Sequence, residues 1–274
     1  MKQRVIVAAI FVPILFVVLF ILPPYALAIV VAAICAIAAY ELLHAIGVNG
    51  NKRIPIYAAV SAIIIPAGVY FDVGNTVFRA VLLVLMCLVF VEAIAAFQTK
   101  RQISFAHVLV TLFAGAVIPY FLSGLISLRL MPNGRIFVLL PVAIAFITDG
   151  GAYFVGVLFG KRKAFPRVSP KKTVEGCIGG IAAGIVSMIV FGVIINFNTT
   201  FEVRFWALII YGFVGAIVTE LGDLAFSLIK REYDIKDYGR LLPGHGGMLD
   251  RFDSMIFAAP VIYLLISTIP AIIV

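Results

Sequence analysis

Long apolar runs, several of them close to 20 residues, recur along the whole chain. A helix needs roughly 20 mainly apolar residues to cross a bilayer, so each run is a candidate membrane span. Composition agrees: 64% of residues are apolar, 12% are charged and the mean hydropathy is +1.17, whereas soluble chains are about half apolar and a quarter charged. These features exclude a soluble enzyme, a secreted disulfide scaffold and a disordered tail. They predict an all-α, polytopic helical integral membrane protein.

The apolar runs between charged residues predict about nine transmembrane helices. They cover residues 5–22, 26–43, 54–71, 81–95, 105–126, 136–159, 176–195, 205–218 and 255–272. We expect residues 1–135 to hold the N-terminal transmembrane helices. Residues 136–274 are expected to form a C-terminal transmembrane catalytic region with polar cytoplasmic loops at 160–175 and 219–254.

Basic residues are unevenly distributed between the predicted loops. With the N-terminus in the cytoplasm, 17 of the 21 Lys and Arg side chains fall on the cytoplasmic side, and the opposite topology would reverse this ratio. Such loops face anionic lipid head groups. The aromatic residues lie within the apolar runs rather than among the basic residues, so no nucleic acid partner is expected. The sequence predicts an integral protein of the cell (inner or plasma) membrane, with its active site open to the cytoplasm.

Acidic residues are scarce, yet seven of the 13 lie between Glu220 and Asp253. Asp223 and Asp149 both interrupt apolar segments, where ionisable groups are costly and usually face a polar cavity. Asp250 and Asp253 are three residues apart before the last apolar run, so their carboxylates share one helix face. Two interpretations stay open for this pair: binding of a hard cation, or capping of the helix N-terminus.

A glycine-rich run at residues 243–247 precedes this pair and includes His245, Gly246 and Gly247. Its backbone amides could form an anion-binding nest that leads into a helix. Such turns are common between helices, so the run is weak evidence alone. Together with the nearby cations it predicts a site for phosphate and metal; these cations are Lys230, Arg231, Lys236 and Arg251.

A second polar segment contains Asp149 and, further along, the sequence Ser-Pro-Lys-Lys-Thr at residues 169–173. Ser169, Lys171 and Lys172 place hydroxyl and cationic groups beside a helix start, which suits a phosphate ester. The alternatives are a positively charged membrane anchor and a helix cap formed by Thr173. Neither a GxxxxGK[ST] loop nor a strand-bound GxGxxG is present. A nucleotide would therefore not be held by either of the familiar soluble folds that carry these motifs.

Residues 227–253 resemble the signature of the phosphatidate cytidylyltransferases, also called CDP-diacylglycerol synthases, and residues 148–176 resemble the other polar segment of that family. The resemblance implies a membrane nucleotidyltransferase that joins CTP and phosphatidic acid to give CDP-diacylglycerol and pyrophosphate. It also implies a Mg²⁺ requirement, a second cation site that could take K⁺, and a homodimer.

Site residues follow from the same resemblance. It makes Asp223, Asp250 and Asp253 the metal ligands, and it adds Lys171, Lys172 and His245 to the catalytic set. Substrate contacts are expected from Asp149, Ser169, Lys230, Arg231, Lys236, Asp237, Gly246, Gly247 and Arg251. A lipid phosphate monoester is largely a dianion at neutral pH, so no strong general base is required. His245 is therefore expected to orient substrate or support the loop.

Two other functions remain open from the sequence. A cation-coupled transporter would also carry buried aspartates and glycine-interrupted helices, although the two halves show no evident repeat. A cytidylyltransferase or kinase acting on another lipid would share most of the polar residues. Formation of a CDP-lipid from CTP would separate these alternatives.

Overall fold

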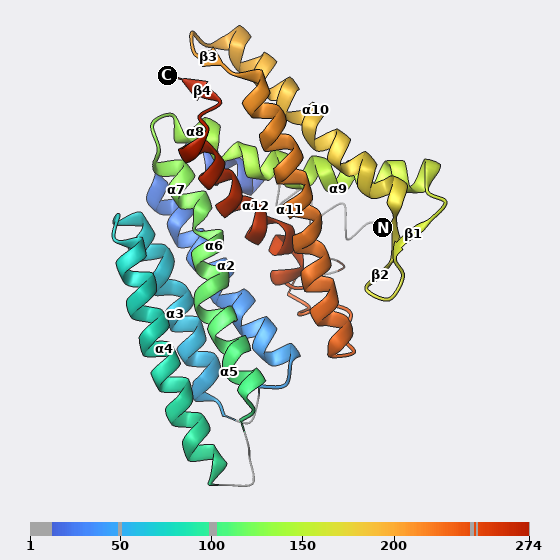
Figure 1. Ribbon diagram of the computed structural model, residues 1–274. Coiled ribbons are helices and arrows are strands. Elements are labelled where there is room, and N and C mark those ends of the chain that lie inside the picture. The colour runs from blue at the N-terminus through green and yellow to red at the C-terminus, as the bar shows by residue number, and fades with distance from the viewer. Residues whose placement is uncertain (1–12, 49–50, 99–102, 242–243, 245, 274) are drawn as a thin grey trace. The chain divides into compact units, whose positions relative to one another are not determined.

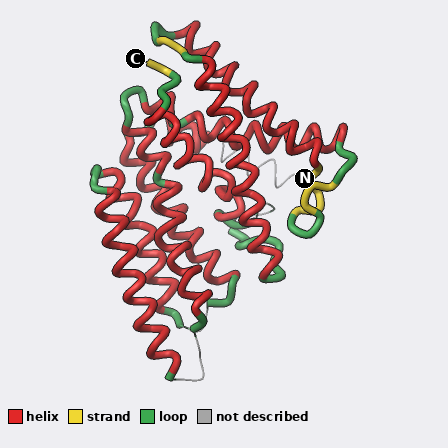
Figure 2. Tube along the Cα trace, viewed as in Figure 1, coloured by secondary structure: helices red, strands yellow, loops and turns green. Residues whose placement is uncertain are grey.

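The structure is a computed structural model that describes residues 13–48, 51–98, 103–241, 244 and 246–273. Helices make up most of this part of the chain, and the strands form two short pairs (Figure 2). The chain divides into two compact units. Unit 1 comprises residues 1–135 and 233–252, and unit 2 comprises residues 136–232 and 253–274.

Unit 1 is a helical bundle in which α3 packs against both α2 and α4 (Figure 1). Ile65, Leu85, Val89, Val108 and Ala116 form a fully buried apolar cluster within it. A π-helical turn, η2, interrupts the segment predicted as one span at 105–126. The elements are η1 (Val17–Ile21), α2 (Pro24–Ala45), α3 (Arg53–Tyr70), α4 (Gly74–Phe97), α5 (Phe105–Leu112), η2 (Phe113–Val117), α6 (Ile118–Leu122) and α7 (Gly124–Leu130); the short α8 (Gly134–Phe137) crosses the boundary between the units in sequence.

Unit 2 is built on three long helices, with α10 packed against both α9 and α11. Gly180 and Gly184 of α10 lie on the buried side of that helix. A Cβ on Gly180 would come within 3.0 Å of the Thr148 carbonyl oxygen, and one on Gly184 within 3.2 Å of the Gly212 carbonyl oxygen. Small residues at these positions allow the backbones to approach closely. The elements are α9 (Leu139–Phe159), β1 (Lys163–Phe165), β2 (Ser169–Thr173), α10 (Val174–Asn198), β3 (Glu202–Val203), α11 (Phe205–Glu232) and β4 (Ile272–Ile273); α12 (Leu249–Thr268) has its first four residues in unit 1 and the others in unit 2.

Seven helical segments in the described part of the chain are long and apolar enough to cross a membrane. The predicted spans at 26–43, 54–71, 81–95 and 176–195 coincide with α2, α3, α4 and α10. Residues 5–12 of the predicted span at 5–22 lie outside the described residues. The seven segments do not include α12, which carries Asp250, Arg251 and Asp253 in its first turns. The chain is therefore a helical membrane protein with several spans.

The long loop predicted from residue 219 is wrong over its first part, because α11 continues to Glu232. Glu220 and Asp223 end the apolar run in the sequence, but they do not end the helix. Asp223 forms an ion pair with Lys172. Gly222 packs closely against α12, because a Cβ placed on it would lie 2.9 Å from the backbone oxygen of Asp253. Helical backbone is thus retained at Asp223, whose carboxylate pairs with Lys172.

The predicted loop at 160–175 contains an antiparallel hairpin formed by β1 and β2, so the chain is not purely α-helical. The capping alternative for Thr173 is confirmed, since its hydroxyl accepts a hydrogen bond from the Gly176 amide at 3.1 Å. Glu175 accepts hydrogen bonds from the amides of Lys161 and Arg162 at 3.1 and 3.2 Å. These bonds fix the start of the hairpin to the first turn of α10.

Candidate functional site

Carboxylates from three helices gather in unit 2. Asp149 comes from α9, Asp223 from α11 and Asp253 from α12, and we call these three residues with Ser254 the acidic cluster. The Ser254 hydroxyl lies 3.4 Å from an oxygen of Asp149 and 3.4 Å from an oxygen of Asp253. Asp223 interacts electrostatically with both of the other carboxylates. The cluster therefore concentrates negative charge at one place.

Lys172 of β2 provides a positive charge beside this cluster. Its ammonium lies 2.8 Å from the Asp223 carboxylate, and the two side chains are only 16% and 28% exposed. Burial alone would lower the pKa of Lys172, but the carboxylates of Asp223, Glu220 and Asp149 together raise the pKa above its ordinary value. Lys172 is therefore held in its charged form.

The neighbouring Lys171 has a different environment. Successive side chains of a strand point to opposite faces, and Lys171 is exposed whereas Lys172 is partly buried. Of the two lysines predicted as catalytic, the structure places Lys172 against the acidic cluster.

Two basic residues at the end of α11 also belong to unit 2. Lys230 is buried and acts electrostatically on Asp253. The Arg231 side chain donates a hydrogen bond from Nε to the Val168 carbonyl at 3.2 Å, which attaches the helix to the hairpin loop. Ser169, another predicted substrate contact, begins β2 and pairs with Phe165 of β1.

The donor chemistry of the acidic cluster fits Mg²⁺. This ion prefers oxygen ligands, and it is commonly held by one or two carboxylates together with substrate phosphates. The three carboxylates outnumber the two nearby ammonium groups of Lys172 and Lys230, which leaves negative charge for a cation to neutralise. Among the described residues, no three His, Cys, Asp or Glu side chains are close enough to enclose a metal by themselves.

Asp250 lies in the residues of unit 1, where it anchors the glycine-rich loop. Its Oδ2 accepts hydrogen bonds from the amides of Tyr238 at 2.8 Å and Gly247 at 3.0 Å. Gly246 has a φ of +85°, a conformation that favours glycine. The joint metal site of Asp223, Asp250 and Asp253 remains a prediction, because Asp250 belongs to the other unit.

Glu41 is a site residue that sequence reasoning missed. Its two carboxylate oxygens accept hydrogen bonds from the amides of Met248 at 3.0 Å and Leu249 at 2.9 Å, where α12 begins. Gly239 and Gly247 lie so close that a Cβ on either would overlap the carboxylate. The available signal was a carboxylate within an otherwise apolar run, which is by default a candidate functional residue.

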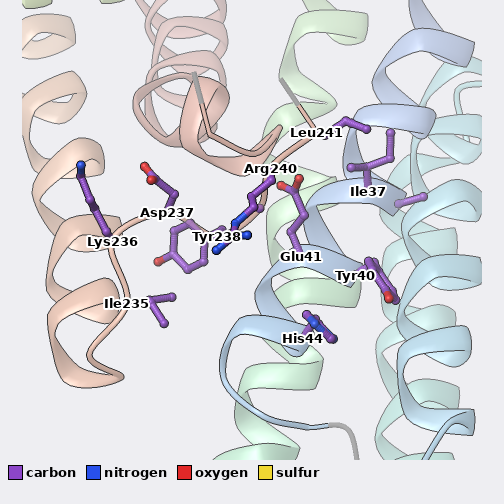
Figure 3. Close-up of a pocket in the computed structure, with 12 residues that line it drawn as sticks. Ile37, Tyr40, Glu41, His44, Ile235, Lys236, Asp237, Tyr238, Arg240 and Leu241 are labelled. Atoms are coloured by element: carbon purple, nitrogen blue, oxygen red, sulfur yellow. The ribbon is translucent and has the colours of Figure 1, made fainter. Parts of the chain in front are cut away.

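A cavity of about 1150 Å³ lies between α2 and the loop at 235–241, all within unit 1 (Figure 3). Its lining includes the predicted substrate contacts Lys236 and Asp237, and also Arg240, which was not predicted. Arg251, in the first turn of α12, is exposed. His245 lies outside the described residues, so its predicted role stays a prediction.

A sequence profile of the cytidylyltransferase family matches residues 2–269. Phosphatidate cytidylyltransferase from Bacillus subtilis is 38% identical over 189 residues, covering 69% of this chain and 66% of the relative. The enzymes of the same name from Staphylococcus saprophyticus and Staphylococcus haemolyticus are 40% and 41% identical over 134 residues, covering 49% of this chain and 50% of each relative. The aligned part of the chain thus spans half to two thirds of these relatives. The resemblance seen at residues 148–176 and 227–253 is confirmed at the level of the family: the chain belongs to the cytidylyltransferase family.

Proposed function

We propose that this protein joins CTP and phosphatidic acid to form CDP-diacylglycerol and pyrophosphate. The observation that carries the proposal is the ion pair between Lys172 and Asp223 of the acidic cluster. The chain that contains this pair belongs to the cytidylyltransferase family. The relatives' name, phosphatidate cytidylyltransferase, supplies the substrate pair.

The reaction matches the side chains of unit 2. An oxygen of the lipid phosphate attacks the α-phosphorus of CTP, a new P–O bond forms, and the bond between the α- and β-phosphates breaks to release pyrophosphate. The attacking phosphate is already ionised at neutral pH, so no residue has to remove a proton. The protein must instead bring two anions together and stabilise charge on the leaving group.

Lys172 is placed to offset phosphate charge, because its raised pKa keeps the ammonium protonated. Lys230 is a second buried cation in the same unit and acts on Asp253. Asp223 and Asp253 would hold Mg²⁺, which when bound neutralises charge on the triphosphate. Asp250 is the third predicted ligand and is tested separately, because its Oδ2 already accepts two backbone hydrogen bonds. A second cation, with K⁺ as one candidate, stays part of the proposal.

The same proposal includes the arrangement in the membrane. It has nine spans, a cytoplasmic N-terminus, an active site open to the cytoplasm and a homodimer in the cell membrane. The supporting observations are the distribution of basic residues along the sequence and the seven helices of spanning length.

The decisive experiment uses the full chain purified in detergent, labelled CTP and phosphatidic acid. We expect a CDP-lipid and an equal amount of pyrophosphate, both dependent on Mg²⁺. Asp223→Asn and Asp253→Asn should lose turnover, whereas Asp72→Asn, in the turn after α3, should retain it.

Products separate the alternatives. A kinase that uses CTP would release CDP rather than pyrophosphate, and a cytidylyltransferase for another lipid would convert a different lipid phosphate. Absence of any cytidylyl-lipid product, with every lipid phosphate tried, would overturn the proposal.

A further inference from the structure

We propose that the cavity of unit 1 binds the phosphate-bearing lipid and that Arg240 contacts its phosphate. This inference rests on the proposed function, because it assigns one of the two substrates to a place in the fold. Neither Arg240 nor the cavity wall on α2 was predicted from the sequence.

One wall of the cavity belongs to a helix of membrane-spanning length; it begins with apolar residues and continues with Glu41 and His44. Ala36, Ile37 and Tyr40 of α2 line it, and α2 is one of the seven candidate spans. The volume of about 1150 Å³ is at the upper end of typical small-molecule sites. It can take a glycerol backbone and the beginning of its acyl chains.

The opposite wall is the loop at 235–241, which is polar and carries two cations, Lys236 and Arg240. Among the residues that the structure describes, Arg240 forms no ion pair. Its planar guanidinium can donate two parallel hydrogen bonds to a phosphate. In Figure 3, Arg240 extends from the loop on the side where Glu41 rises from α2.

Of the two acidic residues that line the cavity, Glu41 has hydrogen-bond partners in unit 1 and Asp237 lies beside the glycine-rich loop. Glu41 accepts hydrogen bonds from the Met248 and Leu249 amides. Asp237 lies close to Gly246, with 3.3 Å between its Oδ1 and an ideal Cβ at that glycine. Two cations, Lys236 and Arg240, thus line the cavity together with these two carboxylates and can donate hydrogen bonds to an anion. That number suits the dianion of a phosphate monoester, and the apolar wall favours a lipid over the more highly charged CTP.

The kinetic test compares Arg240→Gln, Arg240→Lys and the control Arg79→Gln, which removes an exposed cation of α4 in the same unit. With short-chain phosphatidic acid in detergent, Arg240→Gln should raise the KM for the lipid by about 10- to 100-fold, as expected for loss of a charge-assisted contact. The KM for CTP should change less than about twofold. Arg240→Lys should recover part of the loss, and Arg79→Gln should match the wild type.

A second variant tests the apolar wall. Ala36→Phe narrows the cavity without changing charge, so it should raise the KM for phosphatidic acid more as the acyl chains lengthen. A rise in the KM for CTP instead, in either Ala36→Phe or Arg240→Gln, would overturn the assignment of a lipid to this cavity.

A binding measurement keeps the inference testable even if the wild type forms no CDP-lipid, an outcome that would count against the proposed function alone. Thermal unfolding of the protein in detergent is followed with added phosphatidic acid, phosphatidylcholine, inorganic phosphate or CTP. Phosphatidic acid should raise the melting temperature, and Arg240→Gln, but not Arg79→Gln, should abolish this rise. Equal protection by inorganic phosphate, or protection by phosphatidic acid that survives Arg240→Gln, would refute the inference.

Discussion

Removal of the Glu41 carboxylate should release the glycine-rich loop from α2 and weaken the start of α12. The carboxylate is buried and accepts one backbone amide on each oxygen, Met248 at 3.0 Å and Leu249 at 2.9 Å. Amides at a helix N-terminus have no partner within the helix. Glu41 therefore supplies from another helix the acceptors that α12 lacks at its first residues.

The structure sets the size of the effect. Each buried amide that loses its acceptor costs about 1–3 kcal/mol, so Glu41→Ala should destabilise the fold by about 2–6 kcal/mol. Glu41→Gln keeps one acceptor oxygen and should cost about half as much. Total stabilities are about 5–15 kcal/mol, so the alanine variant removes a large fraction.

Two measurements check this prediction. In thermal unfolding in detergent, the melting temperature should fall in the order wild type, Glu41→Gln, Glu41→Ala. Glu202→Gln is the control, because it makes the same change at an exposed carboxylate. Hydrogen exchange of the peptide containing Met248 and Leu249 should accelerate in both Glu41 variants. Unchanged exchange at these two amides in Glu41→Ala would show that the carboxylate does not hold the loop.

Other predictions concern unit 2 and the topology. Lys172→Met should cost about 1–3 kcal/mol because it leaves Asp223 without its cation, whereas Lys171→Ala should cost less than about 0.5 kcal/mol. Since the folded pKa of Lys172 is raised, its stabilisation should be lost as the pH rises above its unfolded pKa of about 10.4 and through the folded pKa, which pH-dependent unfolding of wild type and variant measures. Gly180→Ala should destabilise the fold by about 1–3 kcal/mol through overpacking, since its Cβ would lie 2.7 Å from Oε1 of Glu220. Gly150→Ala should be neutral or stabilising in the same unfolding assay, because a Cβ there would have no atom within 4 Å. Gly244→Cys should react with an impermeant thiol reagent only from the cytoplasmic side of sealed vesicles, and labelling only from the other side would reverse the orientation.

Much of the helical framework could be predicted from the sequence, because hydropathy reports directly on burial in lipid. The runs at 26–43 and 176–195 lie within α2 and α10. Hydropathy does not predict the structure where charged side chains are paired inside the protein. The loop predicted from residue 219 included Asp223, yet Asp223 lies on α11, where Lys172, 51 positions earlier in the chain, pairs with its carboxylate. No local pattern contains that contact.

The candidate site shows the same division. Residue type and spacing made Asp149, Lys172 and Asp253 candidates, since charged groups at or near the depth of the membrane are costly unless they are paired or face a polar cavity. They could not separate Lys171 from Lys172, because only the pairing of β1 with β2 sets which lysine turns inward. Glu41 and Ser254 were missed for a related reason. Their partners are 207 and 105 residues away, so no local pattern in the sequence identifies these contacts.

Asp250 and Asp253 posed a single question in the sequence, metal ligand or helix cap, and the structure gives them different environments. Asp250 accepts two loop amides through one oxygen, so its charge is compensated by backbone hydrogen bonds. Asp253 is buried beside Ser254 and interacts with two like charges, Asp223 and Asp149, and with one opposite charge, Lys230. Hydrogen bonds stabilise the charged form of a carboxylate, whereas neighbouring carboxylates destabilise that form unless a cation is bound nearby. Within one turn of α12, the first aspartate therefore has the environment of an anchor for the loop and the second that of a ligand for positive charge.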